Sequence, residues 1–378
     1  MFGINIIIMK VGILTQPLRT NYGGLLQAYA LQTVLKRLGH EVMIINRCYT
    51  DTSNTLLSKI LRIKNILIGR DVDCKDKIKV LFAEKKINEF IQEHYNLSRP
   101  IYTTKELKEC LQHDNLDAII VGSDQVWRPR YSPNIFNYFL DFTRNKNIKR
   151  YSYAASFGVD NWEFNQNETI ICSKLAQLFD GITVRESSAI DLCENNLKVQ
   201  ANLVLDPTLL LSAQDYNQLL TDKTLKSNGE LFTYILDSSL EKKGIINQIA
   251  NDTHLNSFVC MPTQKLTFKN AKTNLKDCQF PAVEQWIQSF VDAKMVVTDS
   301  FHGTVFSIIF KKPFWVISNQ RRGNTRMESL LELFGLKDRL ITNDNLSNKD
   351  WNTPIDWDKV YEIKKNWQVK SMNFLQNI

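Results

Sequence analysis

Short apolar runs rich in β-branched residues alternate along this chain with amphipathic stretches, and this alternation limits the fold more than any other feature. The first unit contains a strand over Lys10–Leu14, a polar loop over 17–24, a helix over 25–38 that stops at Gly39, and a strand over 41–46. Strand, helix and strand in this order are typical of a parallel, doubly wound sheet.

The same rhythm continues and then restarts after Pro207. Further strands are expected at 117–121, 150–155, 181–184 and 203–206, and then at 231–236, 257–261, 295–297 and 313–317. Two successive units favour an α/β fold with two Rossmann-like domains that face each other across a cleft. The predicted parts are an N-terminal domain over 1–206 with a helical, basic insertion at about 51–115, a linker region over 207–228, a C-terminal domain over 229–350, and a C-terminal helix over 351–378 that packs back on the N-terminal domain.

Composition narrows the classes of partner and compartment. The seven cysteines are scattered and never in CxxC spacing, which favours reduced thiols in a cytoplasm over a disulfide framework or a zinc site. The net charge of +7 suits anionic small molecules or an anionic membrane surface. No stretch interleaves basic and aromatic residues, so we expect no nucleic acid partner. The apolar N-terminus lacks the features of a signal peptide and is expected to form a strand, with Met1 or Met9 as the start.

One segment of the insertion leaves a membrane contact open. Residues 58–69 carry three basic residues, no acid, and an apolar face. A helix lying on a membrane has this composition, and so has a surface helix that docks on its own domain. We therefore expect a cytoplasmic protein and keep a peripheral position at the inner face of the membrane as an alternative.

Four polar turns follow predicted strands, at the sheet edge where open α/β sheets bind ligands. The turns cover residues 20–24, 122–127, 184–187 and 298–302. In the last turn, Ser300 and His302 precede a helix start at Gly303 and Thr304, and a helix start favours an anion next to a titratable imidazole. The alternative is that His302 only caps or packs at the turn.

Charged residues in and after the other turns also allow two interpretations each, one functional and one structural. Arg185 is suited to clamp a carboxylate or phosphate, or to pair with Glu186 or Asp180. Asp124 is a catalytic carboxylate or a helix cap. A second set of basic residues follows the 313–317 strand and either reaches a phosphate or forms solvated surface: Arg321, Arg322 and Arg326.

These strings together resemble the polysaccharide pyruvyl transferase family. The matching elements are VGILT and TNYGGLLQAYALQ within 11–32, VGSDQVW at 121–127, SYAASFG at 152–158, VRE at 184–186, VLDPTLLL at 204–211 and TDSFHGTVFSIIFKKPF at 298–314. The resemblance implies a fold similar to GT-B glycosyltransferases. It also implies transfer of pyruvate from phosphoenolpyruvate to a sugar of a surface polysaccharide or its lipid-linked precursor, as a ketal.

The resemblance also assigns residues. His302 matches the family's histidine, and Arg185 matches an arginine that such enzymes use on the donor. Many members carry a second arginine two residues before the histidine, where this chain has Ser300 followed by Phe301. Arg321, Arg322 or Arg326 would then have to complete the donor site.

Ketal formation from an enol phosphate needs proton transfer, an activated hydroxyl and a leaving phosphate. We expect His302 as acid and base, with Asp124 as the second acid and base or as the group that binds the acceptor hydroxyl. Arg185 is expected to anchor the donor. The remaining expected donor contacts are Ser300, Gly303, Thr304, Arg321 and Arg326. The expected acceptor and cleft residues are Asn21, Tyr22, Gly23, Ser123, Gln125 and Asp299.

Beyond the donor phosphoenolpyruvate we expect no metal and no cofactor, and the acceptor is expected to be a glycan or a lipid-linked oligosaccharide. Two other functions stay open on the sequence. One is a GT-B-type glycosyltransferase that uses a nucleotide sugar, and the other is a non-catalytic glycan-assembly protein.

Overall fold

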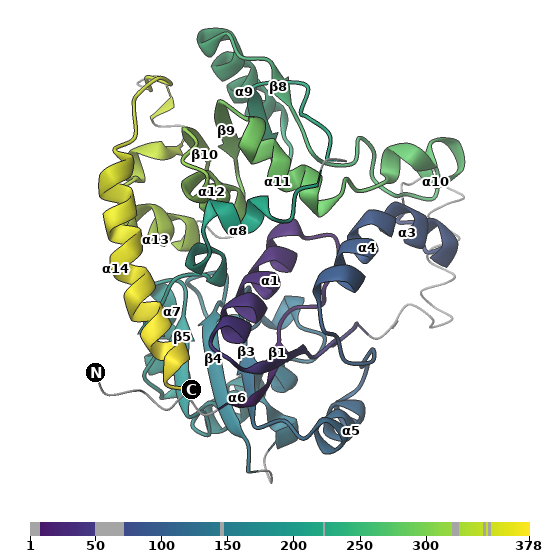
Figure 1. The fold of residues 1–378 in the computed structure, drawn as a ribbon, viewed down its shortest axis with the longest axis vertical. Coiled ribbons are helices and arrows are strands. Elements are labelled where there is room, and N and C mark those ends of the chain that lie inside the picture. Colours follow the sequence, from purple (N-terminus) through teal and green to yellow (C-terminus); the bar gives the residue numbers. More distant parts are fainter. Residues whose placement is uncertain are drawn as a thin grey trace.

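Two parallel β-sheets, each flanked by helices, form the molecule (Figure 1). The computed structural model describes residues 8–49, 72–143, 147–221, 224–319, 325–342, 345–346 and 349–378. Strand order is β2-β1-β3-β4-β5-β6 in the first sheet and β11-β10-β9-β7-β8 in the second, and every neighbouring pair is parallel. The predicted fold class, α/β with two Rossmann-like domains, is confirmed.

The strands of both sheets are short and their central members are buried on both faces. In the first sheet they are β1 (Lys10–Leu14), β2 (Glu41–Ile44), β3 (Ala118–Val121), β4 (Lys149–Ala155), β5 (Gly181–Val184) and β6 (Asn202–Leu203). In the second sheet they are β7 (Leu231–Tyr234), β8 (Ser257–Phe258), β9 (Met295–Thr298), β10 (Phe314–Ile317) and β11 (Leu340–Ile341). All residues of β3, β7, β9 and β10 are buried, as expected for parallel strands covered by helices on both sides.

Helices cover both faces of each sheet (Figure 1). The N-terminal half has α1 (Tyr22–Arg37), α3 (Lys77–Ala83), α4 (Lys85–His94), α5 (Thr104–Asp114), α6 (Gln166–Ala176) and α7 (Ser188–Leu192). The C-terminal half has α8 (Ala213–Asn217), α9 (Leu240–Thr253), α10 (Asn270–Thr273), α11 (Val283–Asp292), α12 (Phe301–Ile309), α13 (Thr325–Leu333) and α14 (Trp357–Gln376). Short 3-10 turns include η6 (Pro207–Leu210) and η7 (Leu275–Cys278).

Several elements differ from their predicted bounds; β2 and β7, for example, each end two residues before the predicted end. Helix α1 begins at Tyr22, three residues before its predicted start, so that Gly23 and Gly24 lie in its first turn. Strand β6 ends at Leu203 instead of continuing to residue 206, and β8 has two residues instead of five. The predicted basic helix over 58–69 lies outside the described residues. None of the described helices combines the length and the apolar composition that a bilayer-spanning segment needs.

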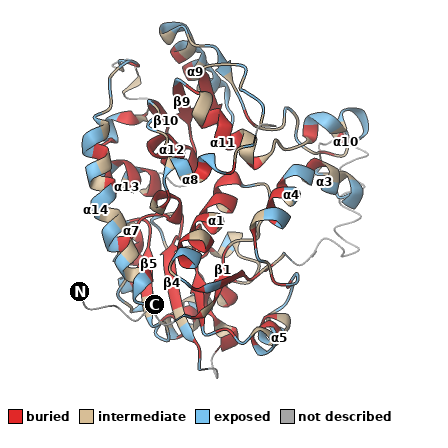
Figure 2. Cartoon of the chain, viewed as in Figure 1, coloured by how far each residue is buried: buried red, intermediate tan, exposed pale blue. Residues whose placement is uncertain are grey.

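One hydrophobic core cluster runs through both halves of the molecule, and Figure 2 shows the buried strands and helices that meet there. Tyr22 of α1 stacks on Trp286 of α11 with ring centroids 5.7 Å apart. Helix α14 also contacts both halves, because Ser371 accepts a hydrogen bond from the Leu205 amide and Tyr361 donates to the Ile309 carbonyl. The halves are therefore packed firmly together. The domain boundaries at 206, 228 and 350 stay predictions.

Candidate functional site

Arg185, the first residue after β5, lies at the centre of a buried group of charged side chains. Its Nη1 donates to Oδ2 of Asp206 at 2.8 Å and its Nη2 to Oδ1 of Asp124 at 3.0 Å. Its Nε lies 3.8 Å from Oε2 of Glu186, and its side chain is 0% exposed. Burial opposes the charge of Arg185, but these three carboxylates outweigh burial and raise its pKa. The guanidinium therefore holds acids together and does not face solvent.

The group forms because three strands end at the same edge of the first sheet. Asp124 follows β3 by three residues, Arg185 follows β5 directly, and Asp206 follows β6 by three residues. Carboxyl ends of neighbouring parallel strands meet at one edge of a sheet. The structure thus brings together Asp124 and Arg185, the residues predicted from the turns at 122–127 and 184–187. Their catalytic roles stay predictions.

Asp124 occupies a strained turn and stays ionised. Its φ of 70° lies in the left-handed region, which costs backbone free energy and often marks functional positions. Its carbonyl accepts from the Ser156 amide at 3.1 Å, and its Oδ2 accepts from Nδ2 of Asn21 at 3.4 Å. Burial opposes ionisation, but the charges of Arg185 and His302 outweigh it and hold the pKa of Asp124 below its usual value. An ionised Asp124 can accept a proton or a hydrogen bond.

Asp206 is a site residue that the sequence reasoning missed. Its Oδ1 accepts from the amide and hydroxyl of Thr208, at 3.1 and 2.6 Å. Its Oδ2 lies 3.1 Å from Oγ of Ser123 and 3.6 Å from Nε2 of His302. Burial opposes its charge, yet His302, Arg185 and Thr208 together hold the pKa of Asp206 far below its usual range. The available signal was an aspartate before Pro207, at the end of a buried apolar run.

His302 comes from the second domain but is surrounded by residues of the first. It is the second residue of α12 and is 6% exposed. On one side its Nε2 approaches Asp206. On the other side it packs against Gly23 of α1, so closely that a Cβ at Gly23 would lie 2.1 Å from Nδ1. The contact with the imidazole therefore requires glycine at position 23. Gly23 was expected at the site, and the structure places it there as the residue on which His302 packs.

Ser300 caps α12, and this cap changes the expected anion site. Its Oγ accepts from the Gly303 amide at 3.4 Å, and its carbonyl accepts from the Thr304 amide at 3.0 Å. The amides of Gly303 and Thr304, expected to hold the donor phosphate, thus already have partners. Within the described ranges, the amides of Phe301 and His302 form no hydrogen bond to protein, as is usual for the first turn of a helix.

Arg326, on α13, is a buried cation. It is 8% exposed, and within the described part of the chain it forms no hydrogen bond and no ion pair. Burial lowers the pKa of Arg326 to about 10, and repulsion from Arg185 adds to this effect, while Asp124 and Glu186 oppose it. Both guanidinium groups approach the ring of Phe301, Arg185 at 4.5 Å and Arg326 at 6.0 Å from its centroid. The expected partners Arg321 and Arg322 lie outside the described residues.

Helix α13 is held in place from both domains. Oγ of Ser329 accepts from the Ser187 amide at 3.1 Å, two residues after Arg185. Oγ1 of Thr304 contacts Sδ of Met327 at 3.2 Å. These contacts hold the helix at the first and third residues after Arg326. That Thr304 contacts the donor stays a prediction.

Glu186 and its neighbours present buried polar atoms without protein partners. Oε1 of Glu186 accepts from the amides of Phe157 and Gly158, at 2.9 and 3.3 Å. Its Oε2, Nε of Arg185 and Nε2 of His302 are buried and have no hydrogen-bond partner in the described protein. Burial raises the pKa of Glu186 above its usual value, against the attraction of Arg185. Unsatisfied buried atoms are uncommon in folded proteins and often mark functional sites.

Tyr22 and Asp299 have structural partners instead of the expected cleft positions. The hydroxyl of Tyr22 donates to the Pro281 carbonyl at 2.8 Å, and the side chain is 0% exposed. Its side chain therefore joins the domains and does not line a cleft. Asp299 accepts from Nζ of Lys242 at 2.6 Å and from the Leu236 amide at 2.7 Å, both within the second domain. Its carboxylate pins β7 to α9 and lies outside the Arg185 group.

Ser123 and Gln125 have hydrogen-bond partners within the protein next to the Arg185 group. Ser123 is buried, and its amide donates to Oε1 of Gln27 at 3.0 Å. Gln125 is half-buried, and its Oε1 accepts from Nη1 of Arg128 at 3.1 Å. Among the expected acceptor residues, Asn21 is the one that is both exposed and bonded to Asp124.

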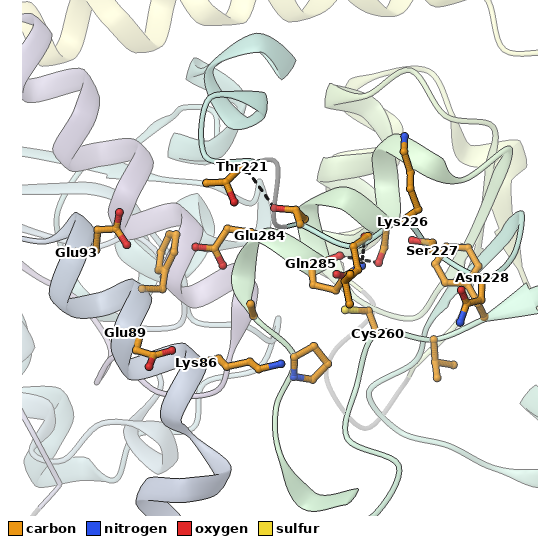
Figure 3. Close-up of a pocket in the computed structure, with 18 residues that line it drawn as sticks. Lys86, Glu89, Glu93, Thr221, Lys226, Ser227, Asn228, Cys260, Glu284 and Gln285 are labelled. Atoms are coloured by element: carbon orange, nitrogen blue, oxygen red, sulfur yellow. Dashed lines mark hydrogen bonds between the residues drawn. The ribbon is translucent and has the colours of Figure 1, made fainter. Parts of the chain in front are cut away.

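A separate cavity of about 800 Å³ lies between the halves of the molecule (Figure 3). It is lined by α4, by residues 221 and 224–228, by the end of β8 and by the start of α11. The carboxylates of Glu89, Glu93 and Glu284 lie in one half of the view, and Lys226 lies in the other. None of the predicted site residues lines this cavity.

No grouping of three or more His, Cys, Asp or Glu side chains suited to hold a metal ion occurs among the residues that the structure describes. That the reaction needs no metal and no cofactor stays a prediction. The cysteines in the described ranges are all free thiols.

Comparison with known proteins gives one family. The sequence model of the family described as polysaccharide pyruvyl transferase matches residues 21–321, most of the chain. A curated relative, General stress protein 30 of Bacillus subtilis (strain 168), is 23% identical over 260 residues, which cover 64% of this chain and 69% of that protein.

Solved structures share the architecture. Arabidopsis thaliana UGT89C1, solved in complex with UDP, has a TM-score of 0.50 and 10% identity, and the match covers 98% of this chain and 99% of that one. UDP-GlcNAc 2-epimerase from Methanocaldococcus jannaschii has a TM-score of 0.48 and 14% identity, with 94% and 92% covered. At 10% identity the likeness to UGT89C1 shows the fold alone, two parallel-sheet α/β domains as in GT-B glycosyltransferases.

Proposed function

The chain belongs to the polysaccharide pyruvyl transferase family, and from this premise we propose that it transfers pyruvate from phosphoenolpyruvate to a sugar as a ketal. The family implies a polysaccharide acceptor, and we propose a surface polysaccharide or its lipid-linked precursor. The proposal rests on the buried charges around Arg185 and on His302 beside them.

The reaction balances with two hydroxyls of one sugar. The enol carbon of phosphoenolpyruvate gains a proton and becomes a methyl group, which makes the neighbouring carbon electrophilic. One hydroxyl oxygen bonds to that carbon, the bond to the phosphate oxygen breaks, and the second hydroxyl closes the ketal. Of the two hydroxyl protons, one replaces the proton given to the enol carbon and the other leaves with phosphate. The protein must therefore move protons and hold an anion.

The His302–Asp206 pair is suited to the proton transfers. Imidazole exchanges protons near neutral pH, and a buried carboxylate next to it orients the ring and stabilises its charged form. Asp206 is ionised and held on its other side by Arg185 and Thr208. Asp124, also ionised and bonded to exposed Asn21, would accept the hydrogen bond of the acceptor hydroxyl.

The burial of the Arg326 guanidinium is the single observation that supports the assignment of the donor site. The charge of Arg185 is already matched by carboxylates, whereas Arg326 is buried and forms no hydrogen bond or ion pair within the described residues. Its guanidinium lies 6.0 Å from the ring centroid of Phe301, the first residue of α12. A buried cation without a counter-ion is costly unless an anion binds to it. Phosphoenolpyruvate has a phosphate and a carboxylate, which match a guanidinium and a helix start. We therefore assign Arg326 as the donor anchor and Arg185 as the residue that holds the acids.

Calorimetry with phosphoenolpyruvate tests this assignment. The wild-type protein is compared with Arg326→Met and with Arg99→Met, a control that removes a surface arginine with 61% of its side chain exposed. Loss of a hydrogen bond to a charged group costs about 1.5–3 kcal/mol, so we expect Arg326→Met to weaken binding about 10- to 150-fold. The control should bind like wild type.

The same experiment separates the alternatives. Equal affinity of wild type and Arg326→Met would place the donor elsewhere. Binding of a nucleotide sugar such as UDP-glucose, with no response to phosphoenolpyruvate, would favour the nucleotide-sugar glycosyltransferase. Where phosphoenolpyruvate binds, incubation with a panel of p-nitrophenyl hexopyranosides should release phosphate and add one pyruvate to an acceptor, as read by mass spectrometry.

A further inference from the structure

Two segments that are about 190 residues apart in sequence form a lobe at the edge of the molecule. We name it the α3–α10 lobe, and it comprises residues 72–83 and 263–278. The Cys74 amide donates to the Leu266 carbonyl at 3.0 Å, and the Phe268 amide donates to the Val72 carbonyl at 2.8 Å. Figure 1 shows α3 and α10 next to each other, away from both sheets. Backbone hydrogen bonds thus join segments from both halves of the chain into one lobe.

The lobe is strongly basic. It contains seven lysines against three aspartates, and one of the aspartates, Asp76, is used to cap α3. Six of the lysines are exposed and Lys79 is half-buried. Within the described ranges, none of the seven forms an ion pair with an acid. The lysines are Lys75, Lys77, Lys79, Lys265, Lys269, Lys272 and Lys276.

Two large apolar side chains stand exposed among these charges. Ile78 is 79% exposed and Leu81 is 61% exposed. They are three residues apart on α3 and therefore lie on one helix face, with exposed Lys77 beside them. Helix α3 packs against η7, and its last residue, Ala83, is buried. The apolar pair is therefore directed away from the protein.

We propose that the α3–α10 lobe docks on an anionic lipid surface. Lysines attract the negative charge of such a surface, and exposed aliphatic side chains among them enter the boundary between headgroups and acyl chains. Helix α3 has seven residues, so it would lie on the surface and not cross it. Nucleic acid fits less well, because the lobe has no arginine and its exposed apolar residues are aliphatic rather than aromatic.

The position of the lobe suits a lipid-linked acceptor. Membrane docking of the lobe does not depend on phosphoenolpyruvate being the donor. Helix α3 runs into α4, which lines the cavity of Figure 3, and the Phe280 amide donates to the Ala83 carbonyl next to that cavity. A membrane contact at the lobe would therefore bring the cavity close to the lipid surface.

Sedimentation of the full-length protein with vesicles tests the proposal. The probes are vesicles of phosphatidylcholine and vesicles in which about a third of the lipid is phosphatidylglycerol. The charge variant is Lys265→Glu/Lys269→Glu/Lys272→Glu, and its matched control on α14 is Lys359→Glu/Lys365→Glu/Lys370→Glu. The apolar variant is Ile78→Ser/Leu81→Ser, with Leu240→Ser, at an 88% exposed position on α9, as its control. Circular dichroism checks that each variant is folded.

We expect wild type to bind the anionic vesicles and not the phosphatidylcholine vesicles. The charge variant should lose at least about tenfold in vesicle affinity and the apolar variant several-fold, while both controls stay near wild type. Three results would overturn the proposal: no binding of wild type to anionic vesicles, equal losses in variants and controls, or tighter binding of the lobe to a DNA duplex than to the vesicles in the same buffer.

Discussion

The group around Arg185 and the cavity of Figure 3 both lie between the halves of this molecule, yet they differ in nearly every physical respect. In the first, the charged side chains are buried, and Arg185 pairs with Asp124 and Asp206 at distances near 3 Å. In the second, acids and lysines line about 800 Å³ of accessible space. Fixed buried charges can stabilise a reaction, and an open, mixed surface can recognise a large ligand. Substitutions in the two regions should therefore affect different quantities.

The largest effect is expected at His302. Replacing it with asparagine removes the proton carrier, so kcat for phosphate release from phosphoenolpyruvate should fall about 10²- to 10⁴-fold. The control is His254→Asn, because His254 is exposed in a left-handed position that asparagine also adopts. If His302→Asn kept its turnover, the imidazole would be a packing group and the Arg185 group would lose its proposed function.

The next effect is on stability and has a defined pH dependence. Asp206→Asn removes one of the carboxylates that pair with the buried Arg185 and should lower the free energy of unfolding by about 3–5 kcal/mol at neutral pH. Because the pKa of Asp206 is depressed in the folded state, its contribution is fully present above the ordinary value of 3.8 and is lost as pH falls below that value. The deficit of the variant should therefore be constant from about pH 8 to pH 4 and shrink in more acidic solution. Urea titrations across this range measure it, and a deficit that shrinks already near neutral pH would contradict the assignment.

A methyl group at Gly23 should have an intermediate effect. The Cβ of Gly23→Ala would lie 2.1 Å from Nδ1 of His302, so the imidazole must shift. Displacement of about 1 Å at a catalytic group costs about 10²-fold in kcat. Gly244→Ala on α9 is the matched control, since its Cβ meets no atom within 4 Å, and it should leave kcat unchanged. Equal kcat values for the two variants would show that the position of His302 is not critical.

The smallest effect is expected in the cavity. Burial raises the pKa of Glu284, and Glu93 and Glu89 add to this effect, so its charge destabilises the fold increasingly as pH rises above the ordinary value of 4.5. Glu284→Gln should therefore increase stability at neutral pH by less than about 1 kcal/mol and leave kcat unchanged. Thermal unfolding at acidic and neutral pH, with turnover measured beside it, checks both parts. A large loss of kcat would place the cavity within the catalytic machinery.

Much of this arrangement could be predicted from local sequence. Buried apolar runs fixed the strands, and polar turns at their ends placed Asp124 and Arg185 at one sheet edge. The start of α1 was predicted too late because Gly23 disfavours a helix locally, and its contact with His302 lies far away in sequence.

Side-chain partners could not be predicted, because they depend on contacts between distant segments. Asp299 is bonded to Lys242, Tyr22 reaches the Pro281 carbonyl, and the amide of Gly303 is satisfied by Ser300. Arg326 was one of three arginines with equal claims on the sequence. The packing of α13 against both domains places Arg326, whereas Arg321 and Arg322 lie outside the described residues.

His302 belongs to one domain, whereas its aspartate and the glycine it rests on belong to the other. A small separation of the two domains would break the contact between the imidazole of His302 and the carboxylate of Asp206. The proton transfer that we propose for His302 therefore requires both domains together. Under this proposal, the protein would not hydrolyse phosphoenolpyruvate while its two domains are apart.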